Sequence, residues 1–255
     1  MGIGSMRKRW LSDLKIKIFA DGADKKGMVA YSQNALIKGF TTNPTLMRKA
    51  GIIDYKAFAL DVLSIIKKHP ISFEVFSDHF DEMLEQALLI AGWGSNVYVK
   101  IPVTNSLGEP SYHFIRQLAS MGVKQNVTAL MTLSQVEEVV KALSQGPSAF
   151  ISVFAGRIAD TGRDPVPFMK KALSLLSPYK HLELIWASPR ELLNILQANK
   201  IGCHIITVTD ELLKKIPLLG KDLQDYSLET VKMFRDDAVK AGFCLTPLKI
   251  ESIKA

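Results

Sequence analysis

The sequence predicts a (β/α)8 TIM barrel, an α/β fold in which eight parallel strands close into a ring with helices outside it. Eight short runs rich in apolar, β-branched and aromatic residues recur along the chain, and a turn signal and a longer helical stretch follow each run. Most runs are continuously apolar, which is typical of parallel strands covered on both faces. The length of 255 residues suits such a barrel. Eight units without a break in composition therefore favour one closed barrel.

The predicted strands and helices alternate along the chain. The strands are Ile16–Asp21, Gly39–Asn43, Ile71–Phe76, Val97–Pro102, Gln125–Leu130, Phe150–Ala155, Leu182–Ser188 and His204–Val208. The helices between them, in which apolar residues return every three or four positions, include Tyr55–Lys67, Asp81–Ala91, Ser111–Ser120, Ser134–Leu143, Pro167–Leu176 and Arg190–Leu196. Thr132 followed by Gln135 has the pattern of a capping box at the start of one helix.

An open, doubly wound sheet is the alternative architecture. A sheet of that kind that binds a dinucleotide carries a G-x-G-x-x-G turn after its first strand, and this sequence has none there. Residues Asp225–Lys240 predict one more helix beyond the eighth unit. We therefore assign residues 1–14 to an N-terminal extension and residues 15–255 to a single barrel domain with an extra C-terminal helix.

The net charge of +7 is compatible with nucleic acid, an anionic membrane surface or small anionic substrates. The only dense basic run is Met6–Trp10, and the other Lys and Arg residues are scattered among acidic ones, unlike a focused nucleic-acid stripe. Two cysteines are too few for a disulfide framework, and no apolar stretch is long enough to span a membrane. We expect a cytoplasmic protein that binds neither nucleic acid nor membrane.

Four charged residues lie in the predicted strands or directly after them. Asp21, Glu74, Lys100 and Arg157 each occur in the C-terminal half of an apolar run or just past it. Charged side chains are almost never buried without a partner, so these positions are candidates for chemistry. In a barrel the C-terminal ends of the strands form one face, where active sites of this fold lie. We expect the four side chains to converge on one cavity.

Each of these residues also has a structural interpretation. Lys100 could extend its amine to the rim of the barrel; alternatively, burial disfavours the charged form of an amine, and the neutral amine is the nucleophile that forms a Schiff base. Glu74 or Asp21 could simply pair with Lys100 as a buried ion pair. Arg157 could be a solvated or salt-bridged loop residue.

Ser188 and Arg190 follow the seventh predicted strand, at the expected start of a helix. Helix N-terminal amides and a guanidinium group both suit a phosphate dianion. The alternative is an N-capping serine beside a surface arginine. The five histidines lack metal-ligand spacing, and neither a G-x-S-x-G elbow nor a Walker-type loop is present, so the sequence predicts no metal and no nucleotide.

Two segments carry a resemblance to a known family. Gly39–Leu46 (GFTTNPTL) and Val97–Thr104 (VYVKIPVT), with Asp21 before them and Ser188-Pro189-Arg190 after them, resemble the transaldolase family, which includes the smaller fructose-6-phosphate aldolases. The resemblance extends from Ile16 to about Ile216.

The resemblance implies a role for each candidate residue. Lys100 forms a Schiff base with a ketose carbonyl, Asp21 takes the proton of the hydroxyl whose carbon is released, and Glu74 and Thr128 position a water molecule. The implied substrate-binding residues are Thr41, Asn43, Ser152, Phe154, Arg157, Ser188 and Arg190, the last three at the phosphate. The family uses neither a metal nor an organic cofactor, its substrates are small sugar phosphates, and its members are homo-oligomers.

Two positions distinguish the branches of the family. This chain has Glu74 and Phe154 where the aldolase branch carries Gln and Tyr, so it resembles the transaldolases, although it is shorter than those of the pentose phosphate pathway. The expected function is transfer of a dihydroxyacetone unit from a ketose phosphate to an aldose phosphate. The alternatives are a lyase that releases free dihydroxyacetone and a non-catalytic barrel that binds sugar phosphates. The loops Gly108–Pro110 and Thr161–Pro165 are expected to set acceptor preference.

Overall fold

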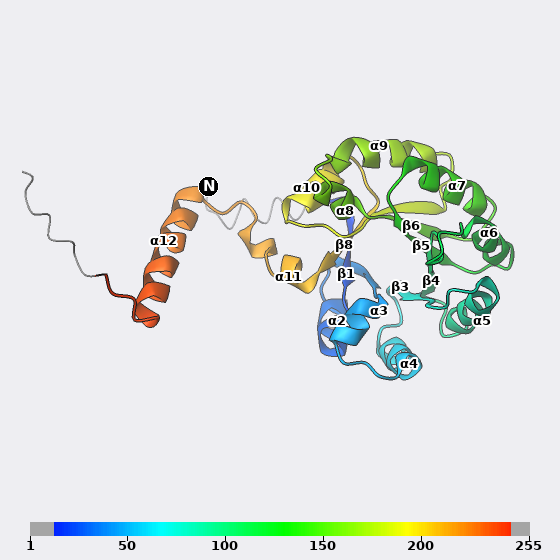
Figure 1. The fold of residues 1–255 in the computed structure, drawn as a ribbon, viewed down its shortest axis with the longest axis horizontal. Helices are drawn as coiled ribbons and strands as arrows, with labels where there is room; N and C mark the ends of the chain where they lie inside the picture. The colour runs from blue at the N-terminus through cyan, green and yellow to red at the C-terminus, as the bar shows by residue number, and fades with distance from the viewer. Residues whose placement is uncertain (1–12, 246–255) are drawn as a thin grey trace, which may run out of the picture. The chain divides into compact units, whose positions relative to one another are not determined.

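Eight parallel strands close into a barrel. The computed structural model describes residues 13–245, and in it each strand pairs with the next along the chain while the first also pairs with the last (Figure 1). The strands are β1 (Lys17–Asp21), β2 (Ile37–Thr41), β3 (Ile71–Glu74), β4 (Val97–Pro102), β5 (Gln125–Leu130), β6 (Ala149–Val153), β7 (Leu182–Trp186) and β8 (Ile205–Thr209). The predicted (β/α)8 barrel is therefore confirmed.

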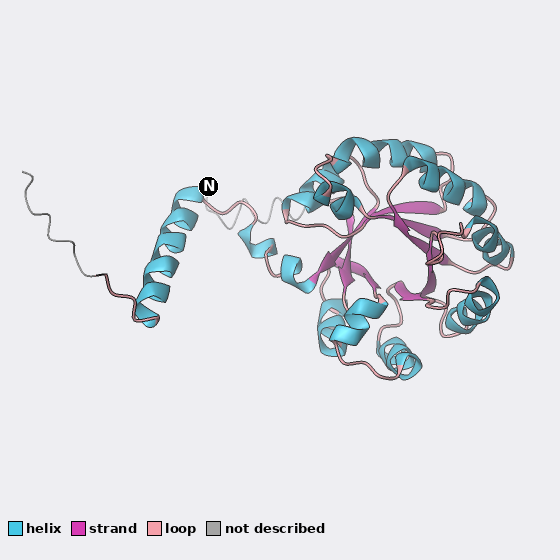
Figure 2. Ribbon diagram, viewed as in Figure 1, coloured by secondary structure: helices cyan, strands magenta, loops and turns pink. Residues whose placement is uncertain are grey.

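Helices surround the ring of strands (Figure 2). They are α2 (Lys25–Ser32), α3 (Pro44–Lys49), α4 (Tyr55–Ile65), α5 (Phe80–Ala91), α6 (Tyr112–Ser120), α7 (Leu133–Leu143), α8 (Ala155–Asp160), α9 (Pro165–Leu176), α10 (Leu193–Lys200) and α11 (Asp210–Leu213). A 3-10 turn at Ile216–Leu218 and helix α12 (Leu223–Lys240) come after them in the chain. The predicted capping box is present at α7: the Thr132 hydroxyl accepts from the Gln135 amide at 3.2 Å, and the Gln135 side chain accepts from the Thr132 amide at 3.0 Å.

The sequence missed the short helices α2, α3, α8 and α11, which have between four and eight residues each. A helix of one or two turns is too short to show an apolar period. Four predicted strands ran two residues too far: those predicted to end at Asn43, Phe76, Ala155 and Ser188 end at Thr41, Glu74, Val153 and Trp186. The second strand ends at Thr41 because Asn43 caps α3 and Pro44 occupies its first turn. The sixth ends at Val153, and α8 begins two residues later.

Aromatic rings fill the inside of the barrel. The ring of Phe19 meets that of Phe150 edge-on at 5.5 Å, and Tyr98 stacks on Phe150 at 4.0 Å. Gly39 leaves the space that the Phe19 ring occupies, since a Cβ atom there would lie 2.6 Å from the ring.

The chain divides into two units, the barrel from Leu14 to Ile216 and a second unit that includes α12. No residue of α12 is buried, and it exposes the apolar side chains of Leu223, Tyr226, Leu228, Val231, Met233, Phe234 and Val239. The assignment of residues 15–255 to one domain stays a prediction, and most of the predicted extension at residues 1–14 lies outside the described residues.

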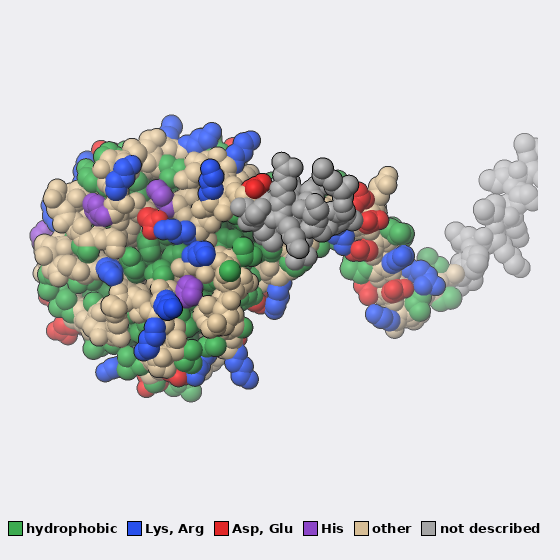
Figure 3. Space-filling model, turned by 180° about the vertical axis from the view of Figure 1, so that it is seen from behind, with side chains coloured by type: hydrophobic (Ala, Val, Ile, Leu, Met, Phe, Trp, Pro, Cys, Tyr) green, Lys and Arg blue, Asp and Glu red, His purple; other side chains and the backbone are tan. Residues whose placement is uncertain are grey.

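The surface carries dispersed basic groups. On the face drawn in Figure 3, the Lys and Arg side chains are scattered over the barrel and do not form a continuous stripe. Within residues 13–245, no helix is both long enough and apolar enough to cross a membrane.

Candidate active site

The C-terminal ends of the strands surround one cavity of about 160 Å³. Its walls contain all the predicted site residues except Glu74. They are Asp21, Thr41, Asn43, Lys100, Thr128, Ser152, Phe154, Arg157, Ser188 and Arg190, joined by Ala187, Pro189, Thr207 and Thr209. Residues spread over almost the whole barrel sequence thus meet in one place, because parallel strands present their C-terminal ends to the same face.

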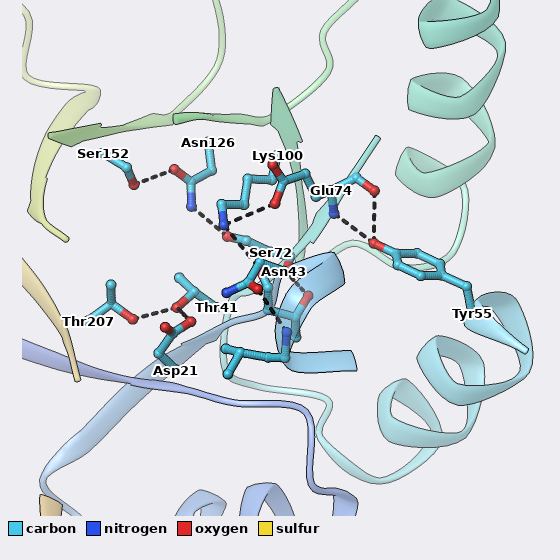
Figure 4. Close-up of polar contacts among 12 residues, drawn as sticks. Asp21, Thr41, Asn43, Tyr55, Ser72, Glu74, Lys100, Asn126, Ser152 and Thr207 are labelled. Atoms are coloured by element: carbon cyan, nitrogen blue, oxygen red, sulfur yellow. Dashed lines mark hydrogen bonds and ion pairs between the residues drawn. The ribbon is translucent and has the colours of Figure 1, made fainter. Parts of the chain in front are cut away.

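Lys100 lies buried in β4 with two polar partners. Its Nζ atom donates a hydrogen bond to the carbonyl oxygen of Thr42 at 3.0 Å and lies 3.2 Å from Oε2 of Glu74 (Figure 4). Only 6% of the Lys100 surface is exposed. Of the alternatives left open for Glu74 and Asp21, the structure pairs Glu74 with the amine. A carboxylate at this distance is also within reach to accept an amine proton.

Tyr55, on α4, fixes the backbone at Glu74. The Tyr55 hydroxyl donates to the Glu74 carbonyl at 2.9 Å and accepts from the Glu74 amide at 2.8 Å (Figure 4). It thereby satisfies backbone groups at the end of β3 after β2 has turned into α3. Burial raises the pKa of Tyr55 well above its ordinary value, so it remains a protonated donor. No sequence pattern indicates this role, since both partners are backbone atoms.

Asp21, at the end of β1, accepts a hydrogen bond from the Thr41 hydroxyl at 2.7 Å. Burial raises the pKa of Asp21, while the positive charge of Lys100 and the bond from Thr41 act in the opposite direction. Thr41 was predicted as a substrate-binding residue. Thr41 lines the cavity and donates its hydroxyl proton to Asp21, and its role in substrate binding stays a prediction.

Thr128 lies within a distorted segment of β5. The pairing of β5 with β6 shifts register between Val127 and Leu130, and Ala129 has a φ of 67°. Such a bulge re-aims side chains next to it. The buried Thr128 hydroxyl lines the cavity and has no hydrogen-bond partner among the described residues. It is therefore free to bind a water molecule or a substrate oxygen.

A buried hydrogen-bonded chain crosses the cavity floor. Ser152 donates to the side-chain oxygen of Asn126 at 2.7 Å, and the Asn126 amide donates to the hydroxyl of Ser72 at 2.9 Å (Figure 4). This chain occupies the hydroxyl proton of Ser152, so the Ser152 oxygen faces the cavity as an acceptor. The sequence predicted Ser152 but neither Asn126 nor Ser72, because both are uncharged residues inside strands.

Asn43 serves as the N-cap of α3. Its side-chain oxygen accepts from the Leu46 amide at 2.9 Å. The cap uses the oxygen and leaves the amide NH2 as a pair of donors beside the cavity. Asn43 can therefore donate to a substrate hydroxyl while its orientation is held by the helix.

Arg157 and Arg190 form the basic part of the cavity lining, which we call the basic wall. The guanidinium carbon of Arg157 lies 5.2 Å from the centre of the Phe154 ring, at a distance that permits a cation–π contact. No carboxylate of the described residues pairs with Arg157. Arg157 lies on α8 rather than in the loop that the sequence interpretation left open.

Arg190 has a carboxylate partner that the sequence did not indicate. Its Nε donates to Oδ1 of Asp160 at 3.0 Å, and its Nη2 donates to Oδ2. The expected helix start is wrong: α10 begins at Leu193, and the side chain of Asn194 accepts from the amides of Arg190 and Glu191 at 2.7 and 3.1 Å. The amides of Arg190 and Glu191 are therefore occupied and do not serve an anion.

The backbone of Ser188 contacts Gly156, which precedes Arg157, and lies two residues before Arg190. It has a φ of 57°, which is uncommon for a residue other than glycine and is often found at functional sites. Its carbonyl oxygen lies so close to Gly156 that a Cβ atom there would be 1.5 Å away. Gly156 thus lets the start of α8 approach the end of β7, and this contact places Arg157 and Arg190 on the same cavity.

The described residues contain no group of three or more His, Cys, Asp and Glu side chains arranged to hold a metal ion. The ionisable residues of the cavity are two carboxylates, one amine and two guanidinium groups, with Glu74 counted beside Lys100. An amine of this kind can act as a nucleophile, carboxylates can accept protons, and guanidinium groups suit an anion.

Comparison with known proteins identifies the family. Residues 18–245 match the profile described as Transaldolase/Fructose-6-phosphate aldolase. The chain belongs to this family. "Probable transaldolase 2" of Listeria monocytogenes is 33% identical over 215 residues, which cover 83% of this chain and 94% of the relative. "Probable transaldolase" of Dehalococcoides mccartyi is 33% identical over 202 residues, 79% of this chain and 90% of the relative. The resemblance seen in the sequence is confirmed at the level of the family.

Solved structures support the fold of this transaldolase-family member. A structure of 2,3-dimethylmalate lyase superposes with a TM-score of 0.54 at 12% identity and covers 97% of this chain and 90% of the other. A structure of mandelate oxidase gives a TM-score of 0.55 at 10% identity, with 81% and 72% covered. Identities this low show the barrel fold alone.

Proposed function

We propose that this member of the family is a transaldolase that transfers a dihydroxyacetone unit from a ketose phosphate to an aldose phosphate through a Schiff base on Lys100. The observation that carries the proposal is the buried Lys100 amine, 3.2 Å from the Glu74 carboxylate, in a cavity that also contains Asp21. A primary amine beside a proton acceptor forms a carbinolamine with a ketone. The basic wall formed by Arg157 and Arg190 suits the phosphate of the substrate.

The first half of the reaction releases an aldehyde. The neutral Lys100 amine adds to the ketose carbonyl, and loss of water gives a protonated imine. Glu74, in contact with the amine, and the unpartnered hydroxyl of Thr128 are the groups that would hold this water. Asp21 then accepts the proton of the C4 hydroxyl as the C3–C4 bond breaks, and the imine takes up the electron pair to become an enamine.

The second half reverses these steps with a new aldehyde. The enamine carbon attacks the acceptor carbonyl, and protonated Asp21 returns its proton to the new alkoxide. Water then hydrolyses the imine and frees Lys100. The amide of Asn43 and the oxygen of Ser152 are suited to hold the hydroxyl groups of the fragment between the two halves. Atoms balance, because each proton and each water molecule released is taken up again.

The lyase alternative differs in the fate of the enamine. Release of free dihydroxyacetone requires protonation of the enamine carbon, and Phe154 brings no phenol to this part of the cavity. We therefore expect transfer to dominate. The test is incubation with fructose 6-phosphate, with and without erythrose 4-phosphate. Rapid release of dihydroxyacetone without an acceptor would contradict the transferase assignment, and absence of reaction in both incubations would favour a non-catalytic barrel.

Asp21→Asn is expected to lower kcat by about 10²- to 10⁴-fold, the usual contribution of a positioned general base. Because burial raises the pKa of Asp21, the acidic limb of the wild-type pH profile of kcat/KM should lie above the ordinary pKa of an aspartate. Activity is lost as the pH falls through this raised pKa, since only the carboxylate accepts a proton. The pH profiles of kcat/KM for both proteins check this. An unchanged acidic limb in the variant would assign the limb to another group.

Arg157→Ala is expected to raise the KM for a phosphorylated ketose about tenfold, with a small change in kcat. The guanidinium has no carboxylate partner among the described residues and lines the cavity, so its contribution is a charge-assisted hydrogen bond to the phosphate, worth about 1.5–3 kcal/mol. The lower end of this range corresponds to the tenfold increase in KM, and the measurement compares fructose 6-phosphate with unphosphorylated fructose. If the variant loses the same factor for both sugars, Arg157 does not bind the phosphate.

A homo-oligomer also fits this function. Helix α12 has no buried residue and exposes apolar side chains such as Val231 and Phe234, whose exposed fractions are 61% and 65%. Large exposed apolar patches usually mark interaction surfaces. Light scattering on the full chain gives the number of copies, and a monomer would contradict the proposal.

A further inference from the structure

We infer that Thr207, on β8, is a positioning residue. It orients the Asp21 carboxylate and favours its ionised form through the hydroxyl of Thr41. The inference rests on the proposed function, in which Asp21 is the proton acceptor of the cleavage step. Three side chains from three different strands carry it. They form a continuous chain from Thr207 through Thr41 to Asp21 (Figure 4).

The chemistry of the three groups fixes the direction of the protons in this chain. A carboxylate only accepts hydrogen bonds, so Thr41 must donate its single hydroxyl proton to Oδ1 of Asp21, at 2.7 Å. The Thr41 oxygen can then only accept from Thr207, and Thr207 must donate. Thr207 is therefore the terminal donor of the chain, although it does not touch the carboxylate.

This order has two effects on Asp21. A hydroxyl that accepts a hydrogen bond becomes a stronger donor, so Thr207 strengthens the bond that favours the charged carboxylate. The chain also holds Oδ1 on one side, which leaves Oδ2 for the substrate hydroxyl. Thr41 and Thr207 are 2% and 6% exposed, so both hydroxyl groups lie inside the barrel and away from the outer surface.

The other charged groups near Asp21 are unchanged by a substitution at position 207. Lys100 faces Asp21 inside the cavity. On the other side, Asp21 shares a pocket between α2 and α11 with Asp24, Asp210, Lys214 and Tyr31, in which Asp210 is paired with Tyr31 and Lys214. A change in the pH profile after a substitution of Thr207 is therefore attributable to the hydroxyl chain.

The test compares three substitutions of Thr207, of which only serine keeps the hydroxyl group. Thr207→Val keeps the shape and removes the donor, and we expect kcat/KM for ketose cleavage to fall about 3- to 10-fold, as for the loss of one hydrogen bond. The acidic limb of its pH profile of kcat/KM should move to higher pH, because the ionised carboxylate is stabilised less by hydrogen bonding. Thr207→Ser should restore both values. Thr207→Ala, which adds no methyl group beside Thr41, should reproduce the valine phenotype.

A double-mutant cycle tests whether Thr207 acts through Thr41. Thr41→Val removes the donor to Asp21, so adding Thr207→Val should cause no further loss in kcat/KM. Independent, multiplying losses would overturn the inference, as would a serine variant as impaired as the valine variant or a valine variant equal to wild type.

Borohydride trapping separates this inference from the proposed function. Wild type and Thr207→Val should both form the adduct on Lys100, because the chain acts on bond cleavage and not on imine formation. If wild type forms no adduct, the Schiff-base proposal fails, and the role of Thr207 fails with it. If wild type is trapped and active but the cycle does not behave as described, only the role of Thr207 is overturned.

Discussion

Lys100→Met is expected to abolish turnover and to remove the adduct that borohydride traps with a ketose phosphate. Methionine fills a similar volume but has no amine, so the covalent route is closed, and a fall in kcat of about 10⁴-fold or more is expected. The adduct is measured by mass spectrometry of the intact chain and its peptides. In wild type it should map to the peptide that contains Lys100.

The matched variant Lys100→Arg separates the nucleophile from the ion pair. Arginine stays charged and can still face Glu74 and the Thr42 carbonyl, yet it does not form an imine. We expect this variant to unfold near the wild-type midpoint and to be inactive. Methionine should cost more stability, because removing one partner leaves Glu74 partly buried without its cation.

Lys124→Met is the control for a lysine elsewhere in the barrel. Lys124 precedes β5, donates to the carbonyl of Ser95 at 2.8 Å and lies outside the residues that line the cavity. It should keep both the activity and the adduct. An adduct that persists after Lys100→Met, or that maps to another lysine in wild type, would contradict the proposed nucleophile.

The sequence predicted the strands well because each is a short apolar run followed by a turn. The same logic predicted that Asp21, Glu74 and Lys100 lie near one another, since charged residues at the ends of parallel strands share a face. The structure agrees with this placement: two of them line the cavity, and Glu74 contacts Lys100. Local pattern and barrel geometry were sufficient for this part of the site.

The sequence did not predict the partners that orient these groups. Tyr55 and Thr207 act through hydroxyl groups whose positions depend on strand register and helix packing. Asp160, which pairs with Arg190, lies on α8, and this helix is too short to show a periodic pattern of apolar residues. Uncharged polar residues are common in any sequence, and nothing in their spacing identifies the few that meet a catalytic group.

Gly156→Ala is expected to destabilise the barrel and weaken phosphate binding together. A Cβ atom at this position would lie 1.5 Å from the carbonyl oxygen of Ser188, and a backbone atom cannot move aside as a flexible side chain does. The start of α8 must then separate from the segment after β7. We expect a loss of about 3–5 kcal/mol in the free energy of unfolding, measured by chemical denaturation.

The matched control is Gly92→Ala, at the C-terminus of α5. Its φ is −70°, and a Cβ atom there would lie 3.4 Å from the nearest carbonyl, so alanine should be neutral or stabilise by about 0.4–1 kcal/mol. If Gly156→Ala unfolds like this control, the start of α8 and the segment after β7 do not make the close contact described above. If it is destabilised but keeps the wild-type KM for the phosphorylated sugar, the close approach supports the fold alone. A joint loss indicates that this contact also holds Arg157 and Arg190 at the distance that one phosphate requires.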